Sequence, residues 1–492
     1  MASFSLLGCH VCKQQDFAVK QALRTHLRRI HNIVLPPGRR GVSKKSCADR
    51  PYVCPSCAET FASLDDQAVH IAYHINRQLQ LFLQYQTSSQ AVSTSPEPST
   101  SSTNHDDGGN NAELGAISPE NVNLDIYEPK ADDRFMIDGF DVSKAFYDFQ
   151  VSVHKRILQG EYLKMESHVQ HVLSLSSIFL VKPKRFHDDL VQHIPDTVLE
   201  KVVKDLAEKF DICTHTISLD LTSRLFPLID DVLNNKIDRD EATIKMMQLK
   251  GQTSRKEYRI VKSFAMIMQK APEYCISDTI MEQELITRYL EPALAPLFDD
   301  ILHDTLFRWT ATINQESKAT TAISISRSRP DACVSGLHGV TWGISRGFGE
   351  VKSSIEANNN YSVARDLIRL GIFAKNAIDL NNMKGCLVFQ SVGRHTFFYL
   401  VTLLHDGVYV MYEITKIEIP MCISDLPSYL GQIGRLMHVL TVYQDYCVPA
   451  DQKDVGSLHS GKRKSMTDPQ HDRILDPSKS RKRQSVTTFR LQ

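Results

Sequence analysis

Two pairs of cysteines near the start of this 492-residue chain are each followed by two histidines at a helical interval. Cysteines that flank a tight turn present both sulfur atoms to one point, and histidines four or five residues apart lie on one face of a helix. Four such ligands suit Zn²⁺ in a closed tetrahedral site, and the metal supplies folding free energy that so short a segment lacks. The predicted ligands are Cys9, Cys12, His26 and His31 in one set, and Cys54, Cys57, His70 and His74 in the other.

The spacings Cys-x2-Cys-x13-His-x4-His and Cys-x2-Cys-x12-His-x3-His resemble those of C2H2 zinc fingers. The resemblance covers residues 9–31 and 52–74, and Tyr52 and Phe61 stand where that family keeps its small aromatic core. Gln67 departs from the family, which packs a leucine there. The resemblance implies two small ββα fingers, at 1–32 and 52–76, each holding a structural Zn²⁺.

The helix positions that read bases in this family carry no arginine, asparagine or glutamine in either finger, so none makes a bidentate base contact. These residues are Val19, Ala22 and Thr25 in the first finger, and Ser63, Asp66 and Val69 in the second. A spacer of 22 residues separates the fingers, which is too long to hold both in one groove. Two uses stay open for the fingers: nucleic-acid contact without sequence specificity, and docking of a protein partner.

Composition places the chain among soluble, intracellular proteins without a membrane partner. No run of 18 apolar residues and no hydrophobic N-terminal signal occurs. Lys plus Arg and Asp plus Glu both number 57, but basic residues cluster at the two ends. Near the C-terminus, Gly461–Lys464 and Lys479–Arg483 form two basic clusters that suit a nuclear-import signal and equally an arm that binds phosphates. Either use leads us to expect a nuclear protein.

Changes in composition predict several segments. The Ser/Thr-rich residues 87–118 read as a disordered linker, residues 133–280 as a helical segment, and residues 450–492 as a disordered basic tail. Residues 281–447 read as an α+β domain with a mixed sheet, which makes the chain multidomain.

Within the α+β domain the pattern alternates between strands and helices. Expected strands cover 340–352, 386–392, 397–404 and 408–419, and a closing helix covers 426–446. Another helix carries an apolar stripe of Val363, Leu367, Ala374 and Ile378, with Arg365, Arg369 and Lys375 off that stripe.

Acidic residues and a lysine gather around one predicted hairpin. Glu350 and Lys352 lie two apart on a strand and therefore project from one face, and Asp331 begins the neighbouring strand. Gln390 lies on a following strand and can join them. Two carboxylates suit Mg²⁺, and a nearby ammonium can position water and offset charge on a phosphate.

This constellation, from about residue 285 to 440, resembles the PD-(D/E)xK nuclease fold, which runs helix, hairpin with the motif, helix, strand. The resemblance implies that Asp331 and Glu350 hold Mg²⁺, that Lys352 assists the attack, and that Gln390 supports the site. Glu284, on the preceding helix, would be a further acidic partner.

Two functions stay open at this stage. The first is a nuclear, zinc-binding regulator without enzymatic activity that binds nucleic acid or protein. The second is a Mg²⁺-dependent nuclease of the PD-(D/E)xK type, recruited to its target by the zinc fingers.

Overall fold

The computed structural model describes residues 52–53, 60–61, 124–212, 219–310, 329–451 and 461–476. The chain divides into two compact units, Met1–Asn111 and Ala112–Gln492. In the first unit, β1 (Tyr52–Val53) pairs antiparallel with β2 (Thr60–Phe61). The eight predicted zinc ligands and the predicted linker 87–118 lie outside the described residues, so both remain predictions.

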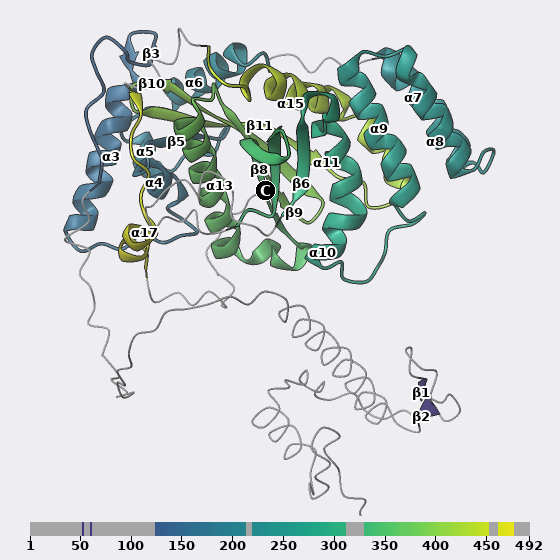
Figure 1. The fold of residues 1–492 in the computed structure, drawn as a ribbon. Coiled ribbons are helices and arrows are strands. Elements are labelled where there is room, and N and C mark those ends of the chain that lie inside the picture. Colours follow the sequence, from purple (N-terminus) through teal and green to yellow (C-terminus); the bar gives the residue numbers. More distant parts are fainter. Residues whose placement is uncertain are drawn as a thin grey trace, which may run out of the picture. The chain divides into compact units, whose positions relative to one another are not determined.

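The second unit is built around a seven-stranded mixed sheet with the strand order β5-β11-β10-β9-β8-β7-β6 (Figure 1). The β5–β11 and β8–β9 pairs are parallel, and the other neighbours are antiparallel. Its strands are β5 (Ile178–Val181), β6 (Thr305–Trp309), β7 (Ala332–His338), β8 (Thr341–Lys352), β9 (Cys386–Val392), β10 (His395–His405) and β11 (Val408–Glu418). The prediction of an α+β fold with a mixed sheet is confirmed for this unit.

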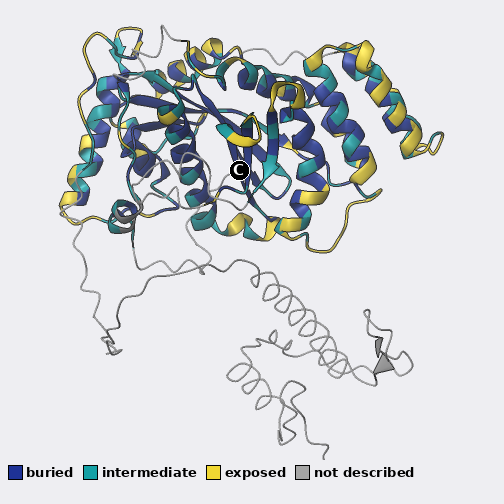
Figure 2. Ribbon diagram, in the orientation of Figure 1, coloured by how far each residue is buried: buried dark blue, intermediate teal, exposed yellow. Residues whose placement is uncertain are grey.

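Helices cover both faces of the sheet. On one face, α13 (Asn360–Asn381) contacts β8, β9 and β10, and Phe373 lies 5.6 Å from Phe348 between ring centroids. On the other face, α11 (Glu291–Phe298) and α15 (Ile433–Tyr446) pack, and Phe298 lies 6.3 Å from Phe398. Figure 2 shows that most of the sheet is consequently buried.

Further helices surround this central sandwich. They are α3 (Val142–Leu158), α4 (Val169–Ser174), α5 (Asp188–Val191), α6 (Asp196–Lys209), α7 (Leu219–Leu233), α8 (Arg239–Gln248), α9 (Arg255–Lys270), α10 (Glu282–Glu284), α14 (Leu426–Leu430) and α17 (Asp468–Ile474). A π-helical turn, Leu285–Leu290, links α10 to α11. A small hairpin of β3 (Met136–Ile137) and β4 (Phe140–Asp141) precedes α3.

The predicted boundary between a helical segment (133–280) and an α+β domain (281–447) is wrong, because β5 from the first pairs with β11 from the second. All four residues of β5 are buried, and its sequence is an unbroken apolar run. Such a short apolar run does not distinguish a buried strand from a buried helix by periodicity. Both segments therefore belong to one unit.

The predicted disordered tail, 450–492, is also wrong for residues 461–476. Met466 and Ile474 are buried, and Leu475 bridges to Leu163 beside α17. A capping box at Thr467 starts this helix, since Thr467 and Gln470 exchange hydrogen bonds. A few apolar residues, Met466 and Ile474 among them, therefore pack this otherwise polar segment against the rest of the unit. Residues 477–492 lie outside the described part.

Gly349 on β8 leaves room for the ring of Phe389, its partner residue on the neighbouring strand β9. A Cβ atom at this position would lie 2.1 Å from Cζ of Phe389, which is closer than real Cβ atoms approach. The ring of Phe389 also contacts Phe307 and Phe398, so it cannot move freely. Glycine at position 349 is therefore required by packing.

We predict that Gly349→Ala lowers the free energy of unfolding by about 1–3 kcal/mol, because the added methyl group overpacks the core. Chemical denaturation of the full chain measures the change. Gly251→Ala is the control, since a Cβ there would meet no atom within 4 Å. Equal stability of the Gly349 variant and the parent would contradict this account of the β8–β9 contact.

Candidate functional site

The order of elements around β8 brings the predicted site residues to one face of the sheet. Asp331 N donates a hydrogen bond to Gly349 O (3.0 Å), which places Asp331 opposite Glu350 just before β7. Across the parallel pair, Gln390 is the register partner of Glu350. Lys352 follows two residues later on β8, so all four side chains lie on the face covered by α13.

Two residues of α13 complete the group. Arg369 Nη2 lies 3.1 Å from Glu350 Oε1, and Arg369 Nη1 lies 3.2 Å from Asp366 Oδ1. Asp366 Oδ2 in turn lies 2.8 Å from Lys352 Nζ. A chain of ion pairs therefore runs from Glu350 through α13 and back to Lys352.

Glu282, at the start of α10, adds a fourth carboxylate, with Oε2 3.9 Å from Lys352 Nζ. Asp331 Oδ2 accepts a hydrogen bond from Val351 N (2.8 Å), which fixes its carboxylate beside β8. We call the group of Glu282, Asp331, Glu350, Lys352, Asp366, Arg369 and Gln390 the acid cluster.

Three buried oxygen atoms of the acid cluster differ in their partners. Asp366 Oδ2 lies 2.8 Å from Lys352 Nζ and Glu350 Oε1 lies 3.1 Å from Arg369 Nη2, whereas Gln390 Oε1 accepts no hydrogen bond among the described residues. Gln390 uses its amide nitrogen, which donates to Val363 O (2.7 Å), so its oxygen points elsewhere. A buried acceptor without a donor is uncommon in folded proteins, so Gln390 Oε1 is available to a hydrogen-bond donor or to a cation.

The cluster also carries more negative than positive charge. Four carboxylates face one ammonium and one guanidinium, which leaves two negative charges when every group is ionised. Burial raises the pKa of Glu350 well above its usual range, and Asp366 adds to this effect, while Arg369 opposes it. A further cation nearby would favour the ionised form of Glu350.

The pKa of Lys352 is also raised, but through its neighbours and against the effect of burial. Burial alone would lower it, but the neighbouring carboxylates, chiefly Asp366, outweigh burial and raise it. Lys352 therefore stays an ammonium at neutral pH and can supply positive charge, but it cannot accept a proton.

The structure brings together Asp331, Glu350, Lys352 and Gln390 as the sequence predicted, but not Glu284. Glu284 pairs with Arg288 (3.1 Å), and Glu282 lies nearest Lys352 instead. Glu282 and Glu284 are two residues apart on a helix, so their side chains point to opposite sides of it. Only one of them can therefore face β8.

Sequence reasoning missed Asp366 and misplaced Arg369 and Lys375. The two basic residues were expected off the buried stripe of α13, yet Arg369 lies in the acid cluster and Lys375 is fully buried. Lys375 Nζ bonds Asp379 Oδ2 and Ser465 Oγ, both at 3.2 Å. The docked segment 461–476 covers this side of the helix, and nothing in the local pattern indicated that. The spacing of Asp366 and Arg369, three apart on one helix face, was the available signal.

Among the described residues, two groups place three potential metal-ligand atoms within 4.8 Å of one another: His171, His187 and Asp189, and Cys275, Cys422 and Asp425. The carboxylates of the acid cluster do not form such a group in this conformation. A metal ion there would have to draw carboxylates together, away from Arg369 and Lys352.

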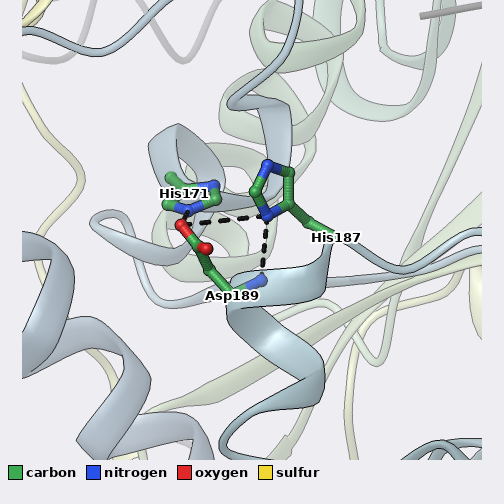
Figure 3. Close-up of side chains that lie close together, drawn as sticks. All are labelled: His171, His187 and Asp189. Carbon is green, nitrogen blue, oxygen red and sulfur yellow. Dashed lines mark hydrogen bonds and ion pairs between the residues drawn. The ribbon is translucent and has the colours of Figure 1, made fainter.

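Figure 3 shows the Asp189 carboxylate beside the rings of His171 and His187. Oδ2 of Asp189 lies 2.9 Å from His171 Nε2 and 3.9 Å from His187 Nδ1, and Arg156 pairs with the same oxygen. Neighbouring charges and hydrogen bonds hold the pKa of Asp189 at about 2 against the effect of its partial burial, so His171 Nε2 donates to a carboxylate.

The lone pairs in this group do not converge on a metal position. His187 Nδ1 accepts a hydrogen bond from Asp189 N (3.1 Å), so its lone pair is used. The free lone pair of His171 is on Nδ1, the nitrogen away from Asp189, because Nε2 carries the proton. We interpret these residues as a hydrogen-bonded cluster that fixes α4 against α5, and not as a metal site.

No protein-family model, no curated protein and no solved structure matches this chain. In the described part of the chain, none of the helices combines the length and apolar character that crossing a bilayer requires. The interpretation of the acid cluster therefore depends on its own residues and geometry.

We predict that the protein loses stability in mild acid through His171. Burial lowers the pKa of His171 to about 4, whereas the unfolded chain binds this proton below about 6.5. The free energy of unfolding should fall by up to about 3 kcal/mol as the pH falls from about 6.5 to about 4. Buried His471, whose pKa falls to about 3, acts in the same direction.

Denaturation midpoints of the full chain, measured across this pH range, test the assignment. His171→Gln should flatten the profile, because an amide can donate to Asp189 without titrating. His338→Gln, on the exposed tip of the β7–β8 hairpin, is the control. An unchanged slope in the His171 variant would contradict the assignment.

Proposed function

We propose that this protein is a Mg²⁺-dependent nuclease that hydrolyses phosphodiester bonds at the acid cluster. The observation that carries the proposal is a group in which four carboxylates face only two cations, together with Gln390 Oε1, a buried oxygen that accepts no hydrogen bond among the described residues. A divalent cation would satisfy both conditions, since Mg²⁺ binds hard oxygen ligands and carries two positive charges.

The arrangement of elements supports the same proposal. A helix that carries Glu282 precedes the antiparallel strands β6, β7 and β8, and α13 then leads to β9, which is parallel to β8. This is the order that the resemblance to PD-(D/E)xK nucleases implies, with Asp331 before β7 and Glu350 and Lys352 near the end of β8.

The donor set fits the ion by its chemistry. Asp331 and Glu350 would hold Mg²⁺, with the oxygen of Gln390 or the carboxylate of Asp366 beside them. The bound ion would polarise a phosphoryl oxygen and orient a water molecule. Binding would also ionise Glu350, because a nearby cation lowers the pKa of a carboxyl group.

Lys352 contributes charge and orientation. Its ammonium, held by Asp366 and by a hydrogen bond to Val351 O (2.9 Å), can donate to the attacking water and offset charge on the phosphoryl oxygens. In hydrolysis, a bond forms between the water oxygen and phosphorus, and the bond from phosphorus to the leaving oxygen breaks. One water proton passes to the leaving oxygen, and the other remains on the new phosphate monoester.

The zinc fingers would recruit this activity to its target. The antiparallel pairing of β1 with β2, on either side of Cys54 and Cys57, supports a finger in the second set. Because the base-reading positions lack suitable side chains, we infer that the fingers bind nucleic acid without sequence preference or dock a protein partner.

Nuclear localisation is part of this proposal, but only the second of the two basic clusters is assigned as the import signal. Lys462 Nζ donates to Asn382 Oδ1 (2.6 Å), and Arg463 lies 2.9 Å from buried Asp406, so the first basic cluster is engaged by the fold. An import receptor that binds a basic segment in an extended conformation would have to break these contacts. Lys479–Arg483 is therefore the better candidate for an import signal.

A second function is favoured by a specific observation. Arg369 and Lys352 already pair with Glu350 and Asp366, and the carboxylates do not converge within 4.8 Å. A scaffold that had lost its metal would keep such internal ion pairs. The protein would then be a zinc-binding regulator without enzymatic activity.

We predict that purified full-length protein cuts DNA or RNA when Mg²⁺ is present, and that Lys352→Ala lowers the cleavage rate on the order of 100-fold. Asp331→Asn should have a similar effect while keeping the shape of the side chain. Gel-based cleavage assays measure the rates, and thermal unfolding checks that each variant is folded.

Lys204→Ala is the matched control, because this lysine is exposed on α6 and pairs only loosely with Glu208 (3.8 Å). It should cleave at the rate of the parent. Absence of cleavage by the folded parent with both Mg²⁺ and Mn²⁺ would reject the nuclease and favour the regulator.

A further inference from the structure

Two cysteines 147 residues apart in the sequence lie in contact: Cys275 Sγ is 2.9 Å from Cys422 Sγ. Cys275 lies in the segment between α9 and α10, and Cys422 follows β11. Cys422 is buried, whereas Cys275 is exposed. A small reagent can therefore reach one member of the pair from solvent.

The backbone around the pair is already held in place. Ile423 N donates to Pro272 O (2.9 Å), and Ser424 Oγ donates to Glu273 O (3.3 Å). These hydrogen bonds join the two segments within three residues of each cysteine. Since a disulfide needs sulfur atoms about 2.05 Å apart, the side chains have to move by less than about 1 Å.

Metal binding is a poorer use of the same group. Two thiolates on one tetrahedral Zn²⁺, each about 2.3 Å from the metal, lie about 3.8 Å apart, well beyond the separation seen here. The third candidate ligand, Asp425, already accepts from Met421 N (3.0 Å) and pairs with Arg394 (3.2 Å). Both observations favour sulfur–sulfur chemistry.

We propose that Cys275 and Cys422 are a redox-active dithiol that forms a disulfide when a peroxide oxidises it. Cys275 first loses its thiol proton, and its thiolate attacks one peroxide oxygen, so that a sulfur–oxygen bond forms and the oxygen–oxygen bond breaks. The departing hydroxide takes up the released proton and leaves as water. The sulfur of Cys422 then attacks that of Cys275, the sulfur–oxygen bond breaks, and a second water leaves. Two thiols and one hydrogen peroxide thus give one disulfide and two waters.

The disulfide would tie the segment after α9 to the end of β11. That segment, residues 271–281, leads directly to α10 and carries exposed Tyr274, Ile276 and Met281. Oxidation should therefore slow its amide hydrogen exchange. This inference does not depend on the proposed nuclease activity. Its measured outcomes are a disulfide bond and slower amide hydrogen exchange in residues 271–281.

The reaction should be slow at neutral pH. The hydrogen bond to Cys422, together with burial, raises the pKa of Cys275 to about 11, so little thiolate is present. Because the thiolate is the nucleophile, the rate should rise about tenfold per pH unit between pH 7 and pH 9.

The test treats the reduced full-length chain with hydrogen peroxide, blocks remaining thiols and identifies peptides by mass spectrometry. We expect a peptide that links Cys275 to Cys422, the stated rise in rate with pH, and loss of the link on reduction with dithiothreitol. Hydrogen exchange in residues 274–281 should slow only in the oxidised protein.

Cys275→Ser should abolish both changes, and it removes an exposed side chain, so the variant should fold. Cys47→Ser, which removes a thiol elsewhere in the chain, is the control and should keep both. The proposal is overturned if both thiols remain open to alkylation after oxidation. It is equally overturned if Cys275 is found joined to another cysteine, or if the pair holds Zn²⁺.

Discussion

The pairing of strand β8 determines the geometry of the candidate site. It is antiparallel to β7 and parallel to β9, and these two registers bring Asp331 and Gln390 alongside Glu350. Gly349 makes this close pairing possible, since a side chain there would collide with Phe389 on the opposite face. Gly349 and Glu350 therefore lie on opposite faces of β8. Gly349 permits packing on the face covered by α11, and the side chain of Glu350 faces α13.

Burial of charge is the second constraint. An unpaired buried carboxylate is strongly destabilising, and ion pairs offset this only when each charge finds a partner. Arg369 and Lys352 neutralise two of the four carboxylates, while Gln390 Oε1 accepts no hydrogen bond among the described residues. A fold that keeps such a group, at the end of its central hairpin, would gain stability from the divalent cation that we propose. This is the physical reason for preferring a metal-dependent activity over an accidental group of charges.

Much of the site could be predicted from the sequence, because the alternation of side chains along a strand is fixed. Glu350 and Lys352 share a face by this rule, and Gln390 follows from the adjacent strand. The site residues that lie on helices were harder to predict. Asp366 and Arg369 act from α13, which has buried residues at nearly every position along its length, so its pattern did not reveal which polar residues face the sheet. Likewise, β5 and residues 461–476 join the fold through contacts with residues remote in sequence, which local periodicity does not report.

The most direct test of the central claim is the position of a bound divalent cation. Mn²⁺ replaces Mg²⁺ in oxygen-ligand sites, and its anomalous scattering locates it in crystals of the full-length protein. The account predicts an anomalous peak within about 2.5 Å of carboxylate oxygens of both Asp331 and Glu350, with Arg369 displaced from Glu350. A structure grown with saturating Mn²⁺ that shows no peak there, and keeps the pairing of Arg369 with Glu350, would contradict it.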